Sequence, residues 1–503
     1  MTEVAVVGAG FGGCYAAYRL AAAGRRVAVY ERTYRIGGRI RSAPLRAGGW
    51  AELGAMRLNT EAAAVMALVE HLGLAAALEP FPFGRPETFA HTHGGLRRRR
   101  DLAAMPDSDA DMLVARAVEA AVPGFARMRA AFHAARGGGR EAAAVHEHAA
   151  YRAAVHTAAV HGVPLRRVSW PRLLDAALTP DAVRRITHTG GYDVHTGGAA
   201  EWIDVLFDTP PDAHYVALSC GMQALPTILA TRCAGAGGRT RLGHRLVRLE
   251  TTGKRYELTF AVEDFAGRDT GGRECATADA VVLALPQAAL QAIEFAPHLA
   301  ARLRPQWRAD LAAVQPVRAL KLFLAYPEPW WQACGVTEGR STTELPLRQV
   351  WYAPGGASHL LLAAYPSGPS TAMWDRFAAD PERYPVDPAD GTGFADAPPA
   401  PAAAVAHAHR LLCRMHGVDA PPPVAACLQD WAGPRHAAAW HVWRTGRSPG
   451  QVAPRMRAPV PGEAVYVVSD CWTGDPGSIP GVLGCAEDVL RDHLGLPEPP
   501  WLG

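Results

Sequence analysis

A glycine-rich turn between an apolar strand and a helix lies at the start of the chain. Residues 4–32, VAVVGAGFGGCYAAYRLAAAGRRVAVYER, predict a strand, a tight turn, a helix and a second strand. Gly8, Gly10 and Gly13 form the pattern GxGxxG in that turn. The first glycine permits the turn, the second lets the backbone approach a pyrophosphate, and the third lets helix and strand pack closely. The stretch therefore predicts a Rossmann-type α/β domain that binds a dinucleotide.

An acidic residue at the end of the second strand supports the same interpretation. Glu31 stands where a carboxylate can accept hydrogen bonds from a ribose. The glycines alone would be a weak signal, whereas glycine turn, helix, strand and acid in register are specific. This unit leaves open whether the dinucleotide is NAD or FAD.

Length and composition narrow the class of protein. A chain of 503 residues is too long for a single core, so two or three lobes are expected. A net charge of +3 gives no reason to expect nucleic acid or an anionic membrane as a partner. Nine cysteines without a CxxC pair favour reduced thiols, and no His/Cys/Asp cluster has metal-ligand spacing. No apolar run is long enough for a bilayer and a strand begins directly at the N-terminus, so we expect a soluble cytoplasmic protein.

A lysine stands in the middle of an apolar strand at residues 318–331, RALKLFLAYPEPWW. The choice is unusual because the 51 Lys and Arg residues of the chain include only two lysines, Lys254 and Lys321. A buried charged amine is costly unless it is paired, neutral or functional. We therefore expect Lys321 to be functional. The alternative is a lysine that extends its amine to solvent at the end of the strand.

Two motifs after Glu31 identify the dinucleotide. ERTYRIGGRIRS occupies residues 31–42, and AELGAMRLNT follows at residues 51–60. This order resembles the flavin amine oxidase superfamily, and GAMR resembles its L-amino acid oxidase branch. The resemblance implies FAD as the cofactor, with Glu31 at the adenosine ribose and Arg39 near the pyrophosphate.

The same resemblance implies a carboxylate site made by Arg57 and Tyr365. A guanidinium offers two parallel donors that match a carboxylate, and it stays charged when desolvated. Tyr365 ends the apolar strand LLLAAY, where the oxidases place a tyrosine that hydrogen-bonds the same carboxylate. The alternatives are an arginine at the surface or against a phosphate, and a tyrosine of the core.

The lysine strand also resembles this family, in which the lysine amine holds a water molecule facing the flavin N5. Lysine suits that role because it is a compact donor on a flexible stem and can lose its proton when buried. Trp431 resembles the family tryptophan near the flavin. Leu246 occupies the strand position that usually touches adenine, although it is equally a core leucine.

The stretch VYVVSDCWTGDPGSIPGVLGCAEDVL, residues 465–490, resembles the last flavin motif of the family. Asp470 takes the place of an acid, usually Glu, on the ribityl-phosphate side of the flavin. Backbone N–H groups of residues 477–481 are expected near the pyrimidine ring, where a helix N-terminus stabilises negative charge. Ser478 and Pro480 replace the usual aromatic residue and acid, which suggests a bulky or aromatic substrate side chain.

The expected site can be stated residue by residue. The catalytic residues are Lys321, Arg57 and Tyr365, and the substrate contacts are Arg57, Tyr365, Ser478 and Trp440, with Trp440 as a replacement wall. The cofactor contacts are Gly8, Gly10, Gly13, Glu31, Arg32, Gly38, Arg39, Gly54, Ala55, Met56, Arg57, Leu246, Trp431, Asp470, Gly477, Ser478 and Ile479. FAD is expected to be non-covalent because the cysteine that holds the flavin in monoamine oxidases has no counterpart here.

The resemblance implies a flavoenzyme with three structural parts. They are a discontinuous FAD-binding domain (1–60, 220–318 and 444–503), a mixed-sheet substrate domain (61–100, 192–219 and 319–443) and a helical insertion (101–191). The expected enzyme is a homodimer that converts an L-amino acid and O2 to a 2-oxo acid, ammonia and hydrogen peroxide. Three alternatives stay open: an L-amino acid 2-monooxygenase that forms an amide, an amine oxidase without a carboxylate site, and a catalytically degenerate FAD-binding protein.

Overall fold

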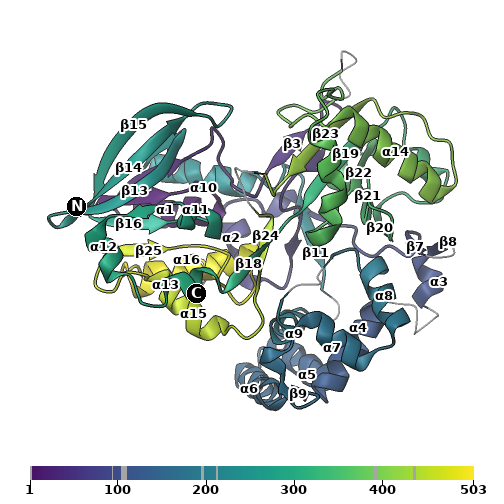
Figure 1. The fold of residues 1–503 in the computed structure, drawn as a ribbon, viewed down its shortest axis with the longest axis horizontal. Helices are drawn as coiled ribbons and strands as arrows, with labels where there is room; N and C mark the ends of the chain where they lie inside the picture. Colours follow the sequence, from purple (N-terminus) through teal and green to yellow (C-terminus); the bar gives the residue numbers. More distant parts are fainter. Residues whose placement is uncertain are drawn as a thin grey trace.

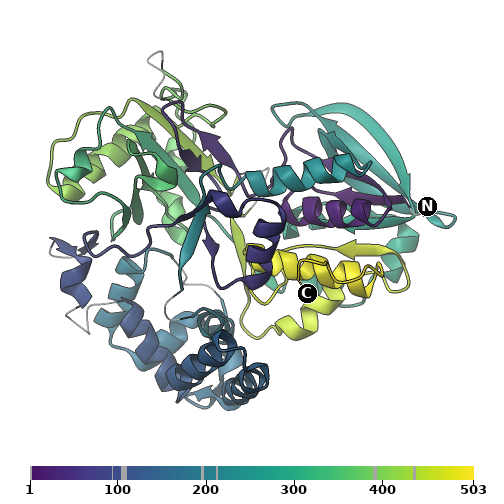
Figure 2. The same cartoon turned by 180° about the vertical axis from the view of Figure 1, so that it is seen from behind.

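The computed structural model describes residues 3–92, 95–103, 110–193, 197–210, 213–388, 393–433 and 438–502. In Figure 1, a region that holds both termini lies on the left, a region built on a large sheet lies at the upper right, and a helical region lies below it. Figure 2 shows the same three regions from behind. The protein is a mixed α/β structure with several sheets, as expected.

The left-hand region is built on a five-stranded parallel sheet whose strands come from distant parts of the chain. The order is β12-β2-β1-β16-β25, and every neighbouring pair is parallel. The strands are β1 (Glu3–Val7), β2 (Arg26–Glu31), β12 (Arg239–Leu242), β16 (Ala280–Leu283) and β25 (Val465–Val467). Their carboxyl ends meet at one edge, which brings residues near 8, 31, 284 and 468 together.

Both faces of this sheet are buried, which explains its nearly continuous apolar strands. Alternate residues of β1 point to opposite faces: Val6 belongs to the core shared with helices, and Val7 to the core shared with a second, mixed sheet. The helical face carries α1 (Phe11–Ala22), α10 (Ala224–Gly235) and α16 (Ile479–Asp492). The other face carries β13 (His244–Thr252), β14 (Arg255–Glu263), β15 (Asp269–Ala278) and β17 (Glu294–Phe295). The helices α11 (Gln287–Gln291), α12 (Pro297–Arg302), α13 (Trp307–Leu311) and α15 (Pro449–Arg457) complete this region.

The upper-right region contains a seven-stranded sheet of order β23-β19-β22-β21-β20-β7-β8. Its strands are β7 (Phe89–Thr92), β8 (Gly95–Arg98), β19 (Leu320–Ala325), β20 (Gly339–Thr343), β21 (Gln349–Tyr352), β22 (Leu360–Ala364) and β23 (Ala425–Asp430). All six residues of β19 are buried, so the predicted buried strand is confirmed. Leu322 packs in the core beneath α14 (Ala402–His416), whereas Phe323 packs in the core on the opposite face. The alternation places Lys321 on the face away from α14.

The lower region is a cluster of helices. It contains α4 (Ala110–Ala121), α5 (Phe125–Gly137), α6 (Glu141–Thr157), α7 (Trp170–Ala177), α8 (Pro180–Thr189) and α9 (Ala199–Asp208). Phe207 of α9 stacks on Tyr151 of α6 with ring centroids 3.7 Å apart, inside the core of this cluster. The helical core therefore continues past the expected limit at residue 191 to Asp208. None of the helices within the described residues combines the length and hydropathy needed to cross a membrane.

Short elements connect the three regions. The strand β18 (Val314–Val317) pairs with β24 (Trp440–Trp443) between the parallel sheet and the seven-stranded sheet (Figure 1). The remaining elements, whether or not they connect regions, are β3 (Ser42–Pro44), β4 (Trp50–Glu52), β5 (Leu58–Asn59), α2 (Ala63–His71), β6 (Leu78–Pro80), α3 (Arg99–Ala103), β9 (Ala159–Val160), β10 (Val163–Pro164) and β11 (Tyr215–Leu218).

The close packing of α1 on β1 makes Gly13 intolerant of a side chain. A Cβ at Gly13 would lie 1.9 Å from the carbonyl oxygen of Gly8. We expect Gly13→Ala to lower the free energy of unfolding by at least about 1–3 kcal/mol, the usual cost of overpacking. Gly235→Ala is the control because a Cβ there has nothing within 4 Å, and it should stabilise by about 0.4–1 kcal/mol. Thermal denaturation measures both, and an unchanged transition in Gly13→Ala would contradict the packing argument.

Candidate active site

The turn after β1 opens onto a large cavity. A Cβ at Gly8 would lie 2.4 Å from the carbonyl oxygen of Ala284, and Gly8 has a φ of +103°. In contrast, a Cβ at Gly10 would meet only the Cα of Gly38, at 3.8 Å, so the backbone at Gly10 is accessible from the cavity. The helix α1 begins at Phe11, and its first N–H groups have no partner within the helix. The turn thus presents a cradle of backbone donors to an anionic ligand.

Glu31 lies beside this turn at the end of β2. One carboxylate oxygen accepts a hydrogen bond from the Ala9 N–H at 2.8 Å, and the other accepts from the Thr33 N–H and hydroxyl at 2.9 Å each. These three donors hold the carboxylate in place at the cavity wall. Glu31 is therefore positioned, with lone pairs remaining, to accept hydrogen bonds from a ribose.

Arg32 and Leu246 line the same end of the cavity. The guanidinium of Arg32 lies 3.1 Å from a carboxylate oxygen of Glu263, which also binds Arg245 at 2.6 Å. Leu246 is 5% exposed and packs in the core beneath the parallel sheet, so it is both a core leucine and part of the cavity wall.

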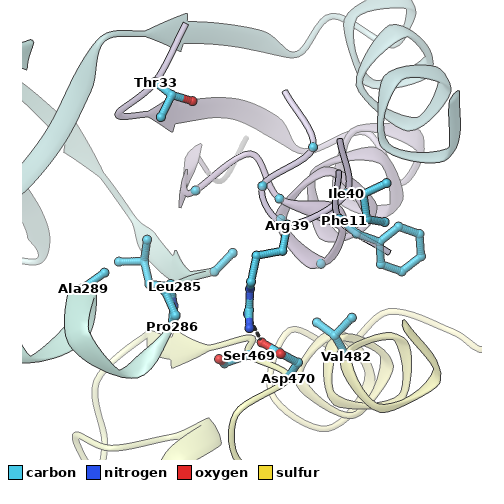
Figure 3. Close-up of a pocket in the computed structure, with 18 of the residues that line it drawn as sticks. Phe11, Thr33, Arg39, Ile40, Leu285, Pro286, Ala289, Ser469, Asp470 and Val482 are labelled. Atoms are coloured by element: carbon cyan, nitrogen blue, oxygen red, sulfur yellow. Dashed lines mark hydrogen bonds and ion pairs between the residues drawn. The ribbon is translucent and has the colours of Figure 1, made fainter. Parts of the chain in front are cut away.

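The cavity measures about 550 Å³ and runs from the glycine turn to Lys321 on the large sheet. Figure 3 shows Arg39 reaching across it from the turn after β2 toward Asp470, which follows β25. Arg39 forms an ion pair with Asp470 and also donates to the carbonyl oxygen of Ala439 at 3.0 Å. Of the expected cofactor contacts, the cavity is lined by Gly8, Gly10, Gly13, Glu31, Arg32, Gly38, Arg39, Gly54, Ala55, Leu246, Trp431, Asp470, Gly477, Ser478 and Ile479. Met56 and Arg57 do not line it.

Lys321 reaches the far end of this cavity from β19. Its amine donates to the carbonyl oxygens of Glu52 at 2.8 Å and Gly54 at 2.6 Å, and it lies 3.4 Å from the sulfur of Met56. Burial lowers the pKa of the amine to about 7, although the nearby Glu52 carboxylate opposes that shift. The amine can therefore exchange a proton near neutral pH. It also lies 4.9 Å from the ring centroid of Tyr365.

Glu52 is a buried acid next to this lysine. Its carboxylate accepts hydrogen bonds from the Met222 N–H at 2.8 Å and the Ser42 hydroxyl at 2.7 Å. Burial raises the pKa of Glu52 to about 7, against these two donors and the charge of Lys321. The carboxyl group of Glu52 and the amine of Lys321 therefore both have a pKa of about 7 within one buried cluster.

A second cavity of about 360 Å³ adjoins the first. The two cavities share four wall residues, Tyr365, Trp440, Gly477 and Ser478. The second cavity is further lined by Arg57, Tyr192, Gly197, Gly198, Glu201, Trp202, Val205, His441, Val442, Trp443, Asp475 and Pro476. The residues expected to contact the cofactor and those expected to contact the substrate therefore meet at one junction.

Arg57 lies among aromatic side chains in this second cavity. Its guanidinium is 5.0 Å from the ring centroid of Phe83 and 5.1 Å from that of Tyr215. It donates to the hydroxyl of Tyr192 at 3.4 Å. These neighbours offer the guanidinium π-faces and a hydroxyl, a setting that favours an incoming carboxylate.

Two tyrosines lie close to this guanidinium with opposite proton affinities. The rings of Tyr192 and Tyr365 are 5.8 Å apart, edge to face. Burial opposes ionisation of the Tyr192 hydroxyl, but the guanidinium groups of Arg57 and Arg340 outweigh burial and lower its pKa. Burial and the proximity of Tyr192 raise the pKa of Tyr365 well above its usual range. Tyr365 is therefore a dependable donor, and Tyr192 is polarised by the positive charge.

The tryptophans near the junction have different roles. The indole N–H of Trp431 donates to the carbonyl oxygen of Leu53 at 2.7 Å, which orients its ring at the wall of the first cavity. Trp440 packs edge to face on Tyr192 at 6.1 Å. A Cβ at Gly477 would lie 2.5 Å from the Cβ of Trp440, so glycine at this position makes room for that tryptophan.

A buried thiol lies behind Asp470. The sulfur of Cys471 is 3.3 Å from His441 Nδ1. Burial, followed by the charge of Asp470, raises the pKa of the thiol to about 12, and burial lowers the pKa of His441 to about 4. Both groups are thus neutral at pH 7. Within the described residues, no cluster of three His, Cys, Asp or Glu side chains has the arrangement of a metal site.

Sequence reasoning missed four of the residues that shape the site. Glu52 precedes GAMR in the quoted motif, and its nearness to Lys321 arises only from the fold. Tyr192 lies in the glycine-rich stretch GGYD, which carries no specific signal. Glu201 lies in the first turn of α9 and Asp475 lies shortly before α16, positions at which an acid usually indicates ordinary helix capping.

Comparison with known proteins identifies relatives over most of the chain. The family model of flavin containing amine oxidoreductases matches residues 11–487. An L-amino-acid oxidase of Mus musculus is 27% identical over 383 residues, which cover 75% of this chain but only 56% of that protein. An L-amino-acid oxidase of Vipera ammodytes ammodytes is 23% identical over 70% of this chain and 67% of its own length. Aplysianin-A of Aplysia kurodai is 23% identical over 98% of this chain and 90% of its own length.

The lowered pKa of Lys321 predicts a pH-dependent stability. Between about 7 and the ordinary value of 10.5, the unfolded chain binds a proton that the folded protein does not. The contribution of this group to stability therefore rises with pH across that window and is constant below it. Lys321→Met removes the dependence, so the variant should be most stable relative to wild type at pH 7 and lose that advantage by pH 10.

Thermal denaturation at several pH values, with FAD in excess, measures this difference. The control is Lys254→Met, which replaces the exposed lysine of the turn between β13 and β14. It should differ from wild type by the same amount at every pH. If the stability difference between Lys321→Met and wild type is also the same at every pH, the claim that burial lowers the pKa of this amine is wrong.

Proposed function

The chain belongs to the flavin containing amine oxidoreductase family, and we propose that it oxidises the α-amino group of an L-amino acid with FAD and O2. The observation that carries the proposal is the position of Arg57. It lines a cavity that joins the large cavity at Tyr365, close to the amine of Lys321. A guanidinium there can bind a substrate carboxylate, which an amine substrate without a carboxylate would not use.

The residues of the first cavity fit FAD. The glycine turn and the N-terminus of α1 would bind the pyrophosphate, Glu31 the ribose, and the start of α16 the flavin ring. When bound, FAD supplies the redox chemistry by taking a hydride from the α-carbon and passing the electrons to O2, which becomes hydrogen peroxide. Hydrolysis of the imino acid then yields a 2-oxo acid and ammonia.

The protein groups align the substrate and manage its protons. Arg57 and the hydroxyls of Tyr365 and Tyr192 would hold the carboxylate from different sides, which directs the α-carbon toward the first cavity. The amine of Lys321, with its pKa of about 7, can hold a water molecule or take up a proton at Nζ. Trp440 and Ser478 form part of the wall at the junction of the two cavities. The second cavity, of about 360 Å³, leaves room for a bulky side chain.

The attachment of the cofactor and the assembly belong to the same proposal. We propose non-covalent FAD, since the raised pKa of Cys471 keeps this thiol beside the site protonated and a poor nucleophile. Release of free flavin into the supernatant after acid precipitation would support it. We also propose a cytoplasmic homodimer, which sedimentation of the purified protein and fractionation of cells would test.

Anaerobic titration with a panel of L-amino acids tests the proposed reaction. We expect bleaching of the flavin absorbance by at least one member of the panel. Admission of O2 should then yield 2-oxo acid, ammonia and peroxide. An amide with carbon dioxide would instead identify an L-amino acid 2-monooxygenase. Bleaching by amines alone, or by nothing tested, would contradict the proposal in favour of an amine oxidase or a catalytically degenerate protein.

Replacement of the carboxylate-binding arginine provides a second test. Loss of one partner of a buried charge pair usually costs about 2–5 kcal/mol. At about 1.4 kcal/mol per tenfold, Arg57→Ala should raise KM for the amino acid roughly 30-fold to several-thousand-fold. Arg57→Lys should recover only part of this loss because a lysine cannot form two parallel hydrogen bonds. The control is Arg46→Ala, which removes an exposed ion pair with Asp387. An unchanged KM in Arg57→Ala would exclude the carboxylate role.

A further inference from the structure

Glu201 is a buried acid in the wall of the second cavity, and no other described residue hydrogen-bonds to its carboxylate. It lies on α9 and is 7% exposed. Neither of its carboxylate oxygens has a hydrogen-bond partner in another described residue, and the N–H that lowers its pKa is its own. Burial raises its pKa to about 7. A carboxylate in such a place is costly unless it receives a donor, so this side chain requires an explanation.

Helix capping does not provide that explanation. Glu201 is the third residue of α9, and an acid there often accepts a hydrogen bond from the N–H of the N-cap residue. The N-cap residue is Gly198, but its N–H donates to the carbonyl oxygen of Trp443 at 3.2 Å. One oxygen of Glu201 lies only 1.9 Å from where a Cβ of Gly198 would be. The glycine therefore leaves room for the carboxylate without satisfying it.

Neighbouring cations leave the carboxylate available as well. The nearest guanidinium, that of Arg166, lies 3.7 Å from one oxygen, beyond hydrogen-bond distance. Among the described residues that line the cavity, Arg57 is the one arginine or lysine. His441, which also lines it, is neutral because burial lowers its pKa to about 4.

Further negative charge surrounds this part of the cavity. Asp475 also lines it, and Asp204 lies close enough to raise the pKa of Glu201. Asp204 and Asp475 likewise raise the pKa of Asp208 nearby. The cavity is therefore bipolar: one part carries the guanidinium of Arg57, and another carries carboxylates.

The wall of this cavity also contains several aromatic side chains. Trp202, Trp440 and Trp443 all line the cavity. Indole faces pack well against the methylene stem of a long side chain and also attract a cation. A substrate with a carboxylate at one end and a cation at the other would match every part of this lining.

We propose that Glu201 binds the cationic end of the substrate side chain, so that the preferred substrates are basic L-amino acids with an amine or a guanidinium. This inference rests on the proposed function, because it takes Arg57 as the site of the α-carboxylate. It replaces an aromatic side chain with a basic one as the expected substrate. Acidic side chains are disfavoured, since they would meet Glu201 and Asp475.

Kinetics with matched substrates test the inference. L-citrulline has the length of L-arginine but carries an uncharged urea group, and L-norleucine has nearly the shape of L-lysine without its amine. At about pH 8.5, where Glu201 is ionised, kcat/KM should be at least about tenfold higher for the charged member of each pair. Glu201→Gln should reduce the preference to within about threefold, mainly by lowering kcat/KM for the charged member of each pair. The control Asp175→Asn, an exposed acid of α7, should keep the full preference.

Equilibrium binding separates a failure of this inference from a failure of the proposed function. The probe is 5-guanidinopentanoate, which lacks the α-amino group and cannot be oxidised. Calorimetry should show it binding the FAD-loaded protein, with Kd raised at least about tenfold by Glu201→Gln and by Arg57→Ala. If the wild-type protein oxidises the charged and the uncharged member of each pair with equal kcat/KM, the inference alone is overturned. An equal loss of kcat/KM for both members of each pair in Glu201→Gln would overturn it in the same way. If no amino acid is oxidised, the proposed function fails, and absence of probe binding would then overturn the inference as well.

Discussion

One buried amine joins the large sheet to the segment that carries the GAMR motif. Lys321 lies on a strand of the large sheet, and its Nζ donates to the carbonyl oxygens of Glu52 and Gly54 on the segment that comes from the parallel-sheet region. Those few residues also carry Gly54 at the first cavity and Arg57 at the second. These two hydrogen bonds link the lysine directly to the segment that carries both the cofactor side and the carboxylate site.

At the junction of the two cavities, the missing side chain of Gly477 makes room for the large side chain of Trp440. Gly477 has no room for a Cβ because Trp440 occupies that space, and Ser478 caps α16 by accepting a hydrogen bond from the Gly481 N–H at 2.9 Å. Where the resembling family places an aromatic residue after the glycine, this chain has a small cap and a tryptophan from β24 instead. Trp440 and Ser478 both line the junction, and the second cavity extends from there to residues of α9.

The sequence predicted those features that are local. The strand, glycine turn, helix and strand of residues 3–31 depend on short-range sterics, and the lysine at position 321 is unusual in any apolar strand. Residues of the motifs near 8–13, 31–39, 54 and 470–479 line one cavity as a set, although they lie hundreds of residues apart. Met56 and Arg57 belong to the same motif but do not line that cavity, because Met56 packs in the core with Phe323 and Arg57 lines the second cavity.

The sequence by itself determined the family to which the chain belongs, the glycine turn and the scarcity of lysine, because each depends on residue types at fixed spacing along the chain. Only the tertiary structure decided which groups, far apart in the sequence, are buried close to one another. Glu52 and Lys321 titrate near pH 7 because burial removes both groups from water, and the pKa of Tyr192 is lowered because Arg57 and Arg340 lie close to it. The unpartnered carboxylate of Glu201 has the same origin. Burial and charge are properties of neighbours in space, and no pattern along the chain records them.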